Sequence, residues 1–117
     1  MEKEKVLITG GAGYIGSVLT PILLDKAYIV TVLDNLMYNQ TSLIHHCSNP
    51  NFKFIKADVT DYSFMKKELQ NHDIIIPLAA IVGAPACKSK PLFAKSINLE
   101  AINFISDNTN ENQKILF

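Results

Sequence analysis

Residues 6–16, VLITGGAGYIG, decide how this chain folds. An apolar run meets spaced glycines and a pattern of helical period follows, which is the order of a strand, a phosphate-binding loop and a helix. The glycines fit two spacings, Gly11-x-Gly13-x-x-Gly16 and Gly10-x-x-Gly13-x-x-Gly16. In either spacing Gly13 lets the main chain approach a pyrophosphate, and Gly16 lets the helix lie close to its strand. The first N–H groups of that helix would face the anion.

The residues after this loop complete a dinucleotide-binding unit. Apolar side chains recur at helical spacing and predict one buried helix face: Ile15, Val18, Leu19, Ile22 and Leu23. Residues 28–33 predict a second strand, which ends at Asp34. A carboxylate there is placed to accept hydrogen bonds from adenosine ribose hydroxyls and would repel a 2′-phosphate, so NAD is favoured over NADP. The alternative is that Asp34 forms a turn with Asn35.

Composition limits the class of protein. The chain has 117 residues, of which 48% are hydrophobic and 19% charged, and this suits one domain over residues 1–117. The formal net charge is zero, so we expect neither nucleic acid nor an anionic membrane as a partner. No apolar run reaches the ~20 residues of a membrane span. Two cysteines without metal-type spacing indicate a reduced, cytoplasmic setting.

Strands and helices are expected to alternate along the chain. We predict strands near residues 5–9, 28–33, 52–57, 73–78 and 114–117, and helices near residues 14–26, 40–46, 61–71 and 91–108. This alternation implies right-handed crossovers and a doubly wound, Rossmann-type α/β fold with five parallel strands in the order 3-2-1-4-5. Ser89 would cap the last helix, with Pro91 in its first turn. Its expected buried stripe is Phe93, Ile97, Ala101, Phe104 and Ile105.

Five segments in sequence order carry a resemblance to a known family. They are residues 9–17 (TGGAGYIGS), 33–36 (LDNL), 57–61 (ADVTD), 78–80 (LAA) and 98–103 (NLEAIN). Together they resemble the N-terminal part of the NAD-dependent epimerase/dehydratase family, the extended short-chain dehydrogenase/reductases that act on nucleotide sugars. The resemblance runs over essentially the whole chain.

The resemblance implies roles for the first two motifs. The backbone N–H groups of Tyr14 and Ile15 would bind the pyrophosphate of NAD within the glycine loop. Asp34 and Asn35 would lie at the adenosine ribose. These residues, with Gly10, Gly13 and Gly16, form the expected cofactor cradle.

The later motifs would meet the two ends of NAD. By the same resemblance, Asp58 would accept from the adenine amino group and the Val59 N–H would meet an adenine ring nitrogen. Three residues would line the path to the nicotinamide: Leu78, Ala79 and Ala80. Asn98 would steady the site from its helix. The alternatives are that Asp58 opens a turn before a helix capped by Asp61, and that Asn98 is an ordinary polar residue on a helix flank.

Three residues depart from what the family and the fold favour: Ala27, Pro77 and Pro21, which lies inside the first helical pattern and should kink it or be absorbed by a local shift. Ala27 stands where the family usually has a glycine at the end of the first helix, and a left-handed turn there would cost ~1 kcal/mol for alanine. Pro77 falls in a central strand, where its missing N–H removes a ladder bond.

The resemblance also implies catalytic residues that this sequence does not contain. The family uses a Tyr-x-x-x-Lys pair and a Ser or Thr beyond the fifth strand, whereas this sequence ends inside that strand, at Phe117. We therefore assign no catalytic residue. Tyr62 and Lys66 have the right spacing but follow the third strand, so ordinary exposed helix positions are favoured. The His45-His46 pair lacks further ligands, and no metal site is expected.

Two functions remain open at this point. The first is the NAD-binding portion of a nucleotide-sugar epimerase or dehydratase, truncated relative to the family and inactive alone. The alternative is a non-catalytic NAD-binding sensor or partner module. In both cases the last strand would be an apolar edge, open to self-association or to a complementing chain.

Overall fold

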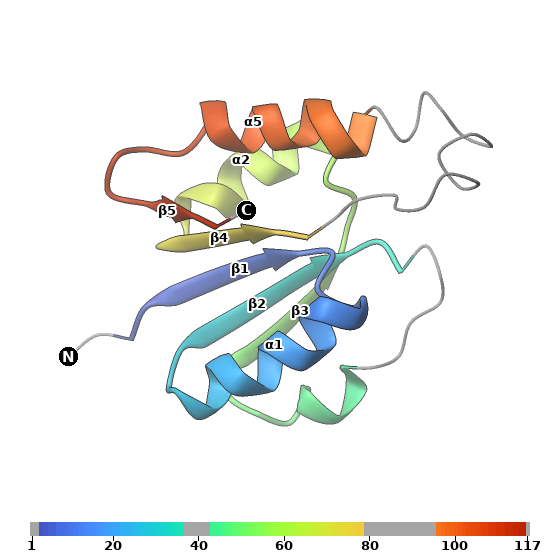
Figure 1. The fold of residues 1–117 in the computed structure, drawn as a ribbon, viewed down its shortest axis with the longest axis vertical. Coiled ribbons are helices and arrows are strands. Elements are labelled where there is room, and N and C mark those ends of the chain that lie inside the picture. Colours follow the sequence, from blue (N-terminus) through green and yellow to red (C-terminus); the bar gives the residue numbers. More distant parts are fainter. Residues whose placement is uncertain (1–2, 37–42, 79–95, 117) are drawn as a thin grey trace.

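Five parallel strands form one sheet in the order β3-β2-β1-β4-β5, with helices on both faces (Figure 1). The computed structural model describes residues 3–36, 43–78 and 96–116. The strands are β1 (Lys5–Thr9), β2 (Ile29–Asp34), β3 (Phe52–Lys56), β4 (Ile74–Pro77) and β5 (Lys114–Ile115). The helices are α1 (Tyr14–Asp25), η1 (Ile44–His46), α2 (Tyr62–Gln70), η2 (Ser96–Ala101) and α5 (Ile102–Asp107). The predicted fold class and strand order are confirmed.

The register of the sheet brings the carboxyl ends of β1, β2 and β4 together. Thr9 pairs with Leu33 of β2 on one side and with Pro77 of β4 on the other. β1 is central and therefore buried on both faces, which explains its unbroken run of β-branched and aliphatic residues. The loops that follow these three strands therefore begin at one edge of the sheet, where doubly wound folds bind ligands.

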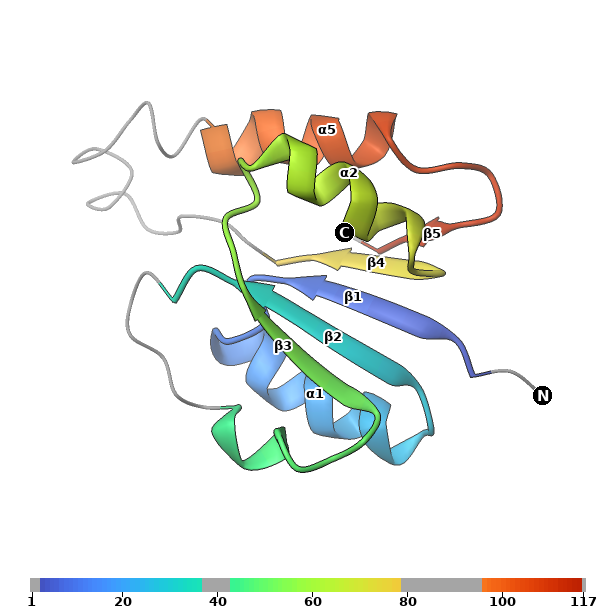
Figure 2. The same cartoon turned by 180° about the vertical axis from the view of Figure 1, so that it is seen from behind.

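Two hydrophobic clusters, one on each face of the sheet, pack the helices against the strands. The α1-side core combines residues of α1 with alternate strand positions such as Ile8, Val32 and Ile76. The α2–α5 core combines both of those helices with the intervening strand positions, including Leu7 and Ile75. Figures 1 and 2 show α1 on one side of the sheet and α2 and α5 on the other.

The buried face of α1 differs in part from the predicted one. Leu19 and Leu23 pack against the α1-side core as predicted. Ile15, Val18 and Ile22 are exposed, whereas Gly16, Thr20 and Leu24 are buried. The cause is Gly16, because a Cβ at this position would overlap the backbone of Gly11. The helix turns its smallest residue toward the loop, and this rotation carries Ile15, Val18 and Ile22 outward.

Three other predicted elements differ in their bounds or type. The described part of the predicted helix 40–46 is only the 3-10 turn η1, and β5 ends at Ile115. The predicted helix 91–108 is described from Ser96, and the described segment Ser96–Ala101 is π-helical rather than α-helical. Ala101 and Ile105 are buried as expected, whereas Ser89, Pro91 and Phe93 lie outside the described residues. No helix in the described ranges is long and apolar enough to cross a membrane.

Ala27 and Pro77 are accommodated differently. Ala27 has φ of 67°, so the left-handed turn after α1 is made by an alanine, as the sequence suggested. Pro77 does not interrupt the pairing of β4 with β1, because the next N–H, that of Leu78, donates to Thr9 O at 2.8 Å. Neighbouring N–H groups of a strand point in opposite directions, so the missing N–H of Pro77 faces β5.

Candidate cofactor site

The glycine loop links β1 to α1 through a tight backbone path. Gly10 has φ of 71°, in the left-handed region, and its N–H donates to Leu33 O at 2.7 Å. A Cβ at Gly11 would lie 2.8 Å from a methyl group of Val32, so a side chain there would displace the end of β2. A Cβ at Gly13 would have only the Gly10 carbonyl nearby, at 3.6 Å, and would instead fill the space in front of the loop.

The first turn of α1 presents backbone N–H donors at this loop. The N–H of Ser17 makes the first intrahelical bond, to Gly13 O at 2.9 Å, so the N–H groups of Tyr14 and Ile15 precede the bonded part of the helix. No side chain caps the helix, and its first turn contains no acidic residue. The side chain of Tyr14 is 85% exposed, which leaves the loop accessible. Such a helix start attracts an anion.

Asp34 joins the end of β2 to the glycine loop. Its Oδ2 accepts from the Ala12 N–H at 3.1 Å, and its Oδ1 accepts from the Leu36 N–H at 2.7 Å. The residue is 8% exposed, so the carboxylate is buried and held in one orientation by two backbone donors. The bond from Leu36 forms the turn at Asp34 and Asn35 that was the alternative interpretation of Asp34. The bond from Ala12 gives Asp34 a second structural role, because it ties the end of β2 to the glycine loop. Each oxygen retains a lone pair for a ligand hydroxyl.

Asp58 and Val59 lie after β3 in a short turn. Asp58 Oδ1 accepts from both the N–H and the hydroxyl of Thr60, at 2.9 and 2.7 Å. Asp61 then caps α2 through the Phe64 N–H at 3.3 Å. The turn proposed as the alternative for Asp58 is therefore present. Val59 is buried in the α2–α5 core, which fixes the backbone of this turn.

The nicotinamide end of the predicted site is only partly described. Leu78 follows β4 and packs against the α1-side core. Ala79 and Ala80 lie outside the described residues, and Asn98 is described by its backbone alone, within η2. Thr9, at the end of β1, has a buried hydroxyl without a hydrogen-bond partner among the described residues. Neither the buried Thr9 hydroxyl nor the bond between Asp34 and Ala12 was predicted from the sequence.

Two motifs that resemble a catalytic pair and a metal site have other structural roles. The Tyr62 ring stacks on the Phe104 ring, with centroids 4.5 Å apart, so it joins α2 to α5 instead of facing the glycine loop. The rings of His45 and His46 lie side by side, with centroids 3.9 Å apart. Within the described ranges no group of three potential metal ligands occurs.

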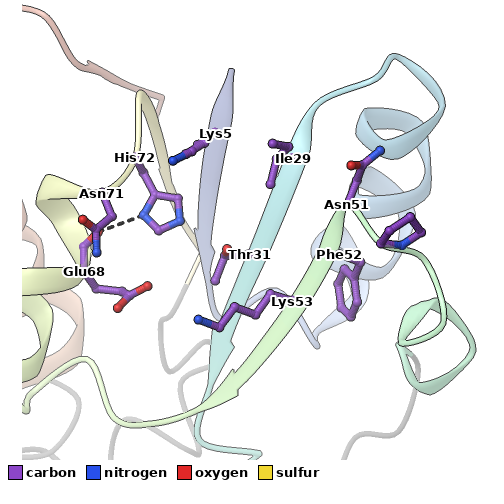
Figure 3. A pocket seen from close by; sticks show the side chains of 10 residues that line it. Lys5, Ile29, Thr31, Asn51, Phe52, Lys53, Glu68, Asn71 and His72 are labelled. Atoms are coloured by element: carbon purple, nitrogen blue, oxygen red, sulfur yellow. Dashed lines mark hydrogen bonds between the residues drawn. The ribbon is translucent and has the colours of Figure 1, made fainter. Parts of the chain in front are cut away.

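A recess of about 370 Å³ lies at the opposite, amino edge of the sheet (Figure 3). Lys5, Thr31, Lys53 and His72 line it. The Nδ1–H of His72 donates to the Glu68 carbonyl at 2.8 Å, and burial of the ring lowers the His72 pKa below its usual value. This recess is separate from the glycine loop, because the loop follows the other ends of the strands.

The strand order, the glycine loop and the acid that ends β2 place the chain in the Rossmann-type, doubly wound class of α/β domains. Its family follows from comparison. The sequence profile of the NAD dependent epimerase/dehydratase family matches residues 6–105, so the chain belongs to that family.

Individual relatives agree with this assignment. A UDP-N-acetyl-alpha-D-glucosaminuronate decarboxylase of Bacillus cytotoxicus is 37% identical over 102 residues, which cover 87% of this chain and 30% of that protein. The UDP-Glc/GlcNAc 4-epimerase of Campylobacter jejuni has a TM-score of 0.80 at 28% identity, over 90% of this chain and 33% of that chain. DesIV, a dTDP-glucose 4,6-dehydratase of Streptomyces venezuelae solved with NAD and TYD bound, has a TM-score of 0.79 at 29% identity, over 88% and 34%. This chain therefore spans about a third of the length of these relatives.

Proposed function

We propose that residues 1–117 form the NAD-binding part of a nucleotide-sugar epimerase or dehydratase. One observation carries this proposal: the buried carboxylate of Asp34 accepts from the Ala12 N–H of the glycine loop at 3.1 Å, and α1 begins two residues later, at Tyr14. A hydroxyl acceptor held against the loop that leads into a helix N-terminus fits the ribose and pyrophosphate of a dinucleotide. Membership of the family favours the same ligand.

The glycine loop would bind and orient the cofactor. The N–H groups of Tyr14 and Ile15 would donate to the pyrophosphate, and Gly13 would leave the space that a Cβ would fill. Asp34 would accept from ribose hydroxyls with the lone pairs that Ala12 and Leu36 do not use. A 2′-phosphate would meet this carboxylate at close range, so NADP should bind less tightly than NAD.

The remaining predicted positions would hold the two ends of the cofactor. Asp58 and the Val59 N–H would face the adenine, with Asp58 fixed by its bonds to Thr60. Asn35 would lie beside the ribose, and Asn98 would approach from η2. The nicotinamide path would be lined by Leu78, Ala79 and Ala80. When bound, NAD supplies a hydride acceptor for a sugar carbon and, in the complete reaction, usually returns that hydride.

The chain alone should bind NAD without converting a sugar. Tyr62 and Lys66 provide its only Tyr-x-x-x-Lys spacing, and the Tyr62 ring is engaged with Phe104. The proposal includes a cytoplasmic location, which an exposed free thiol at Cys47 favours.

Calorimetric titration of NAD and NADP into residues 1–117 tests the proposal. We expect saturable NAD binding and at least tenfold weaker NADP binding, with the preference reduced in Asp34→Asn. Asp61→Asn is the matched control, because this exposed carboxylate caps α2 and should not affect the preference. Absent or only millimolar NAD binding by a folded sample would refute the proposal. Reduction of NAD by a UDP-sugar with the chain alone would refute the expected inactivity.

A further inference from the structure

The recess at the amino edge of the sheet collects two lysine side chains on one face of the strands (Figure 3). Phe52 and Phe54 of β3 belong to the α1-side core, so Lys53 between them points to the α2 side. Leu7 of β1 belongs to the α2–α5 core, and Lys5, two residues earlier, therefore points to the α2 side as well. Both lysines project from the same face of the sheet.

Strand β2 lies between the two lysines and keeps them within reach of one ligand. Thr31 of β2 pairs with Lys53, and β2 pairs with β1 on its other side. Strands β1 and β3 are therefore about 10 Å apart, and the four-carbon stems of Lys5 and Lys53 let both ammonium groups approach a common anion. Figure 3 shows both side chains extending toward the end of α2 that borders the recess.

The end of α2 adds a buried histidine that has one ring nitrogen unused. His72 is 7% exposed, and its Nδ1–H donates to the Glu68 carbonyl, which leaves Nε2 as an acceptor. No partner of Nε2 lies within the described part of the chain. Charged groups surround the ring: Lys5 and Lys53 from the strands, and Glu68 and Asp73 from α2 and the turn after it. On protonation Nε2 becomes a third donor beside the two ammonium groups.

The charge of the recess is positive. Neither Lys5 nor Lys53 forms an ion pair with another described residue, and the Asp73 carboxylate accepts instead from the Lys5 backbone N–H at 2.9 Å. With His72 neutral, the lining carries the two lysine charges against the single carboxylate of Glu68. Two ammonium groups in one recess repel each other, and a dianion between them removes this repulsion. A phosphomonoester is close to a dianion at neutral pH, whereas each phosphate of a dinucleotide is a singly charged diester.

The size and the other polar groups of the recess indicate a ligand larger than a phosphate ion. Its volume of about 370 Å³ lies in the range of small-molecule sites, about 300–1,000 Å³. The half-buried Glu68 and the side-chain amides of Asn51 and Asn71 line it as well. A carboxylate accepts from hydroxyl groups, and amides both donate to them and accept from them. These groups therefore favour a ligand that carries hydroxyls beside its phosphate.

We propose that the amino-edge recess binds a small phosphomonoester that carries hydroxyl groups, of the sugar phosphate class. Lys5 and Lys53 bind the phosphate, and Glu68, Asn51 and Asn71 bind the hydroxyls. This inference goes beyond the proposed function and does not rest on it, because the glycine loop follows the opposite ends of the strands.

Titration of ribose 5-phosphate into ¹⁵N-labelled residues 1–117, followed by NMR, tests the proposal. Ribose and inorganic sulfate are the comparison probes, because the first lacks the dianion and the second lacks the hydroxyls. The Lys53 amide and the His72 ring report on the recess, and the Tyr14 amide reports on the glycine loop. We expect saturable shifts at the recess with ribose 5-phosphate, weaker binding of sulfate and no binding of ribose. The pKa of His72 should rise on binding, because a dianion beside the ring favours its charged form.

A pair of lysine variants on one strand separates this site from general attraction of anions. Lys53→Gln should weaken ribose 5-phosphate binding by about tenfold, because it removes one of two charge-assisted contacts to the phosphate. Lys56→Gln is the matched control, since it removes the same charge from β3. Lys56 is exposed and lies three positions further along the strand, so its side chain points to the other face. Its affinity should stay within about twofold of the unsubstituted chain.

Three results would overturn this inference. Equal affinities of Lys53→Gln and Lys56→Gln would show that the recess does not hold the phosphate. Shifts centred on Tyr14 would place the phosphate at the glycine loop. Sulfate binding as tight as that of ribose 5-phosphate would remove the role given to the hydroxyls. Ribose 5-phosphate binding at the recess by a chain that does not bind NAD would support this inference and refute only the proposed function.

Discussion

Replacing Asp34 should destabilise the fold as well as the cofactor site. Its two oxygens accept from the N–H groups of Ala12 and Leu36, and the residue is 8% exposed. A hydrogen bond to a charged group contributes about 1.5–3 kcal/mol, and a buried donor left without an acceptor costs a similar amount. Water can replace the acceptor at the half-buried Leu36 more easily than at Ala12. We therefore expect Asp34→Ala to lower the free energy of unfolding by about 3 kcal/mol.

Urea-induced unfolding followed by far-ultraviolet circular dichroism measures this loss. With a slope of about 1.5 kcal/mol per molar urea, the midpoint of Asp34→Ala should fall by about 2 M. Asp34→Asn should lose less, because its amide keeps one acceptor but turns an NH₂ toward one of the two donors. Asp61→Ala is the control, since it removes an exposed cap and should cost about 1 kcal/mol or less. A loss below about 0.5 kcal/mol in Asp34→Ala would refute the role assigned to this carboxylate.

Three further predictions follow from single residues. Ala27→Gly should raise the free energy of unfolding by about 1 kcal/mol and the melting temperature by a few degrees in calorimetry, because φ is 67° there; an unchanged melting temperature would contradict this reasoning. Gly16→Ala should lower both the urea midpoint and the NAD affinity, because its Cβ would overlap the backbone of Gly11. Gly13→Ala should weaken NAD binding with little change in the urea midpoint, because its Cβ has space. Equal effects of the two variants on stability would contradict the loop geometry. Burial keeps the pKa of His72 below its usual value of about 6.5. Below about pH 6.5 the unfolded chain therefore binds a proton at His72 more readily than the folded chain does, and the free energy of unfolding should fall as the pH drops. Urea midpoints across this range should show a weaker pH dependence in His72→Gln, and an unaltered dependence would assign it to other groups.

The sequence predicted the strand order and most element positions because each rests on a local signal. The glycines, the β-branched runs and the Asp34 position lie within short segments whose order is typical of one fold. Family membership followed from the same segments.

The orientation of α1 was not predictable from its hydrophobic pattern. The pattern predicted a buried face that included Ile15, Val18 and Ile22, yet these three are exposed and the helix buries Gly16 and Thr20. The close approach of the Gly16 and Gly11 backbones determines this rotation. Hydrophobic periodicity does not detect this contact, because it depends on the absence of a side chain at Gly16. The spacing of the third glycine was the available signal.

The bond between Asp34 and Ala12 depends on tertiary contacts. Asp34 is 22 residues from Ala12 in sequence, and the two meet only because β1 and β2 are paired in register. The turn at Asp58 was predictable as an alternative, since an aspartate followed by a threonine two residues later favours this geometry.

Residue-level mapping of NAD binding by NMR tests the central claim most directly. Amide shifts of ¹⁵N-labelled residues 1–117 would be followed as NAD is added. We expect the largest shifts at the carboxyl edge of the sheet, at Tyr14, Ile15, Asn35 and Val59. Shifts centred instead on the amino-edge recess at Lys53 and His72, or no shifts in a folded sample, would contradict it.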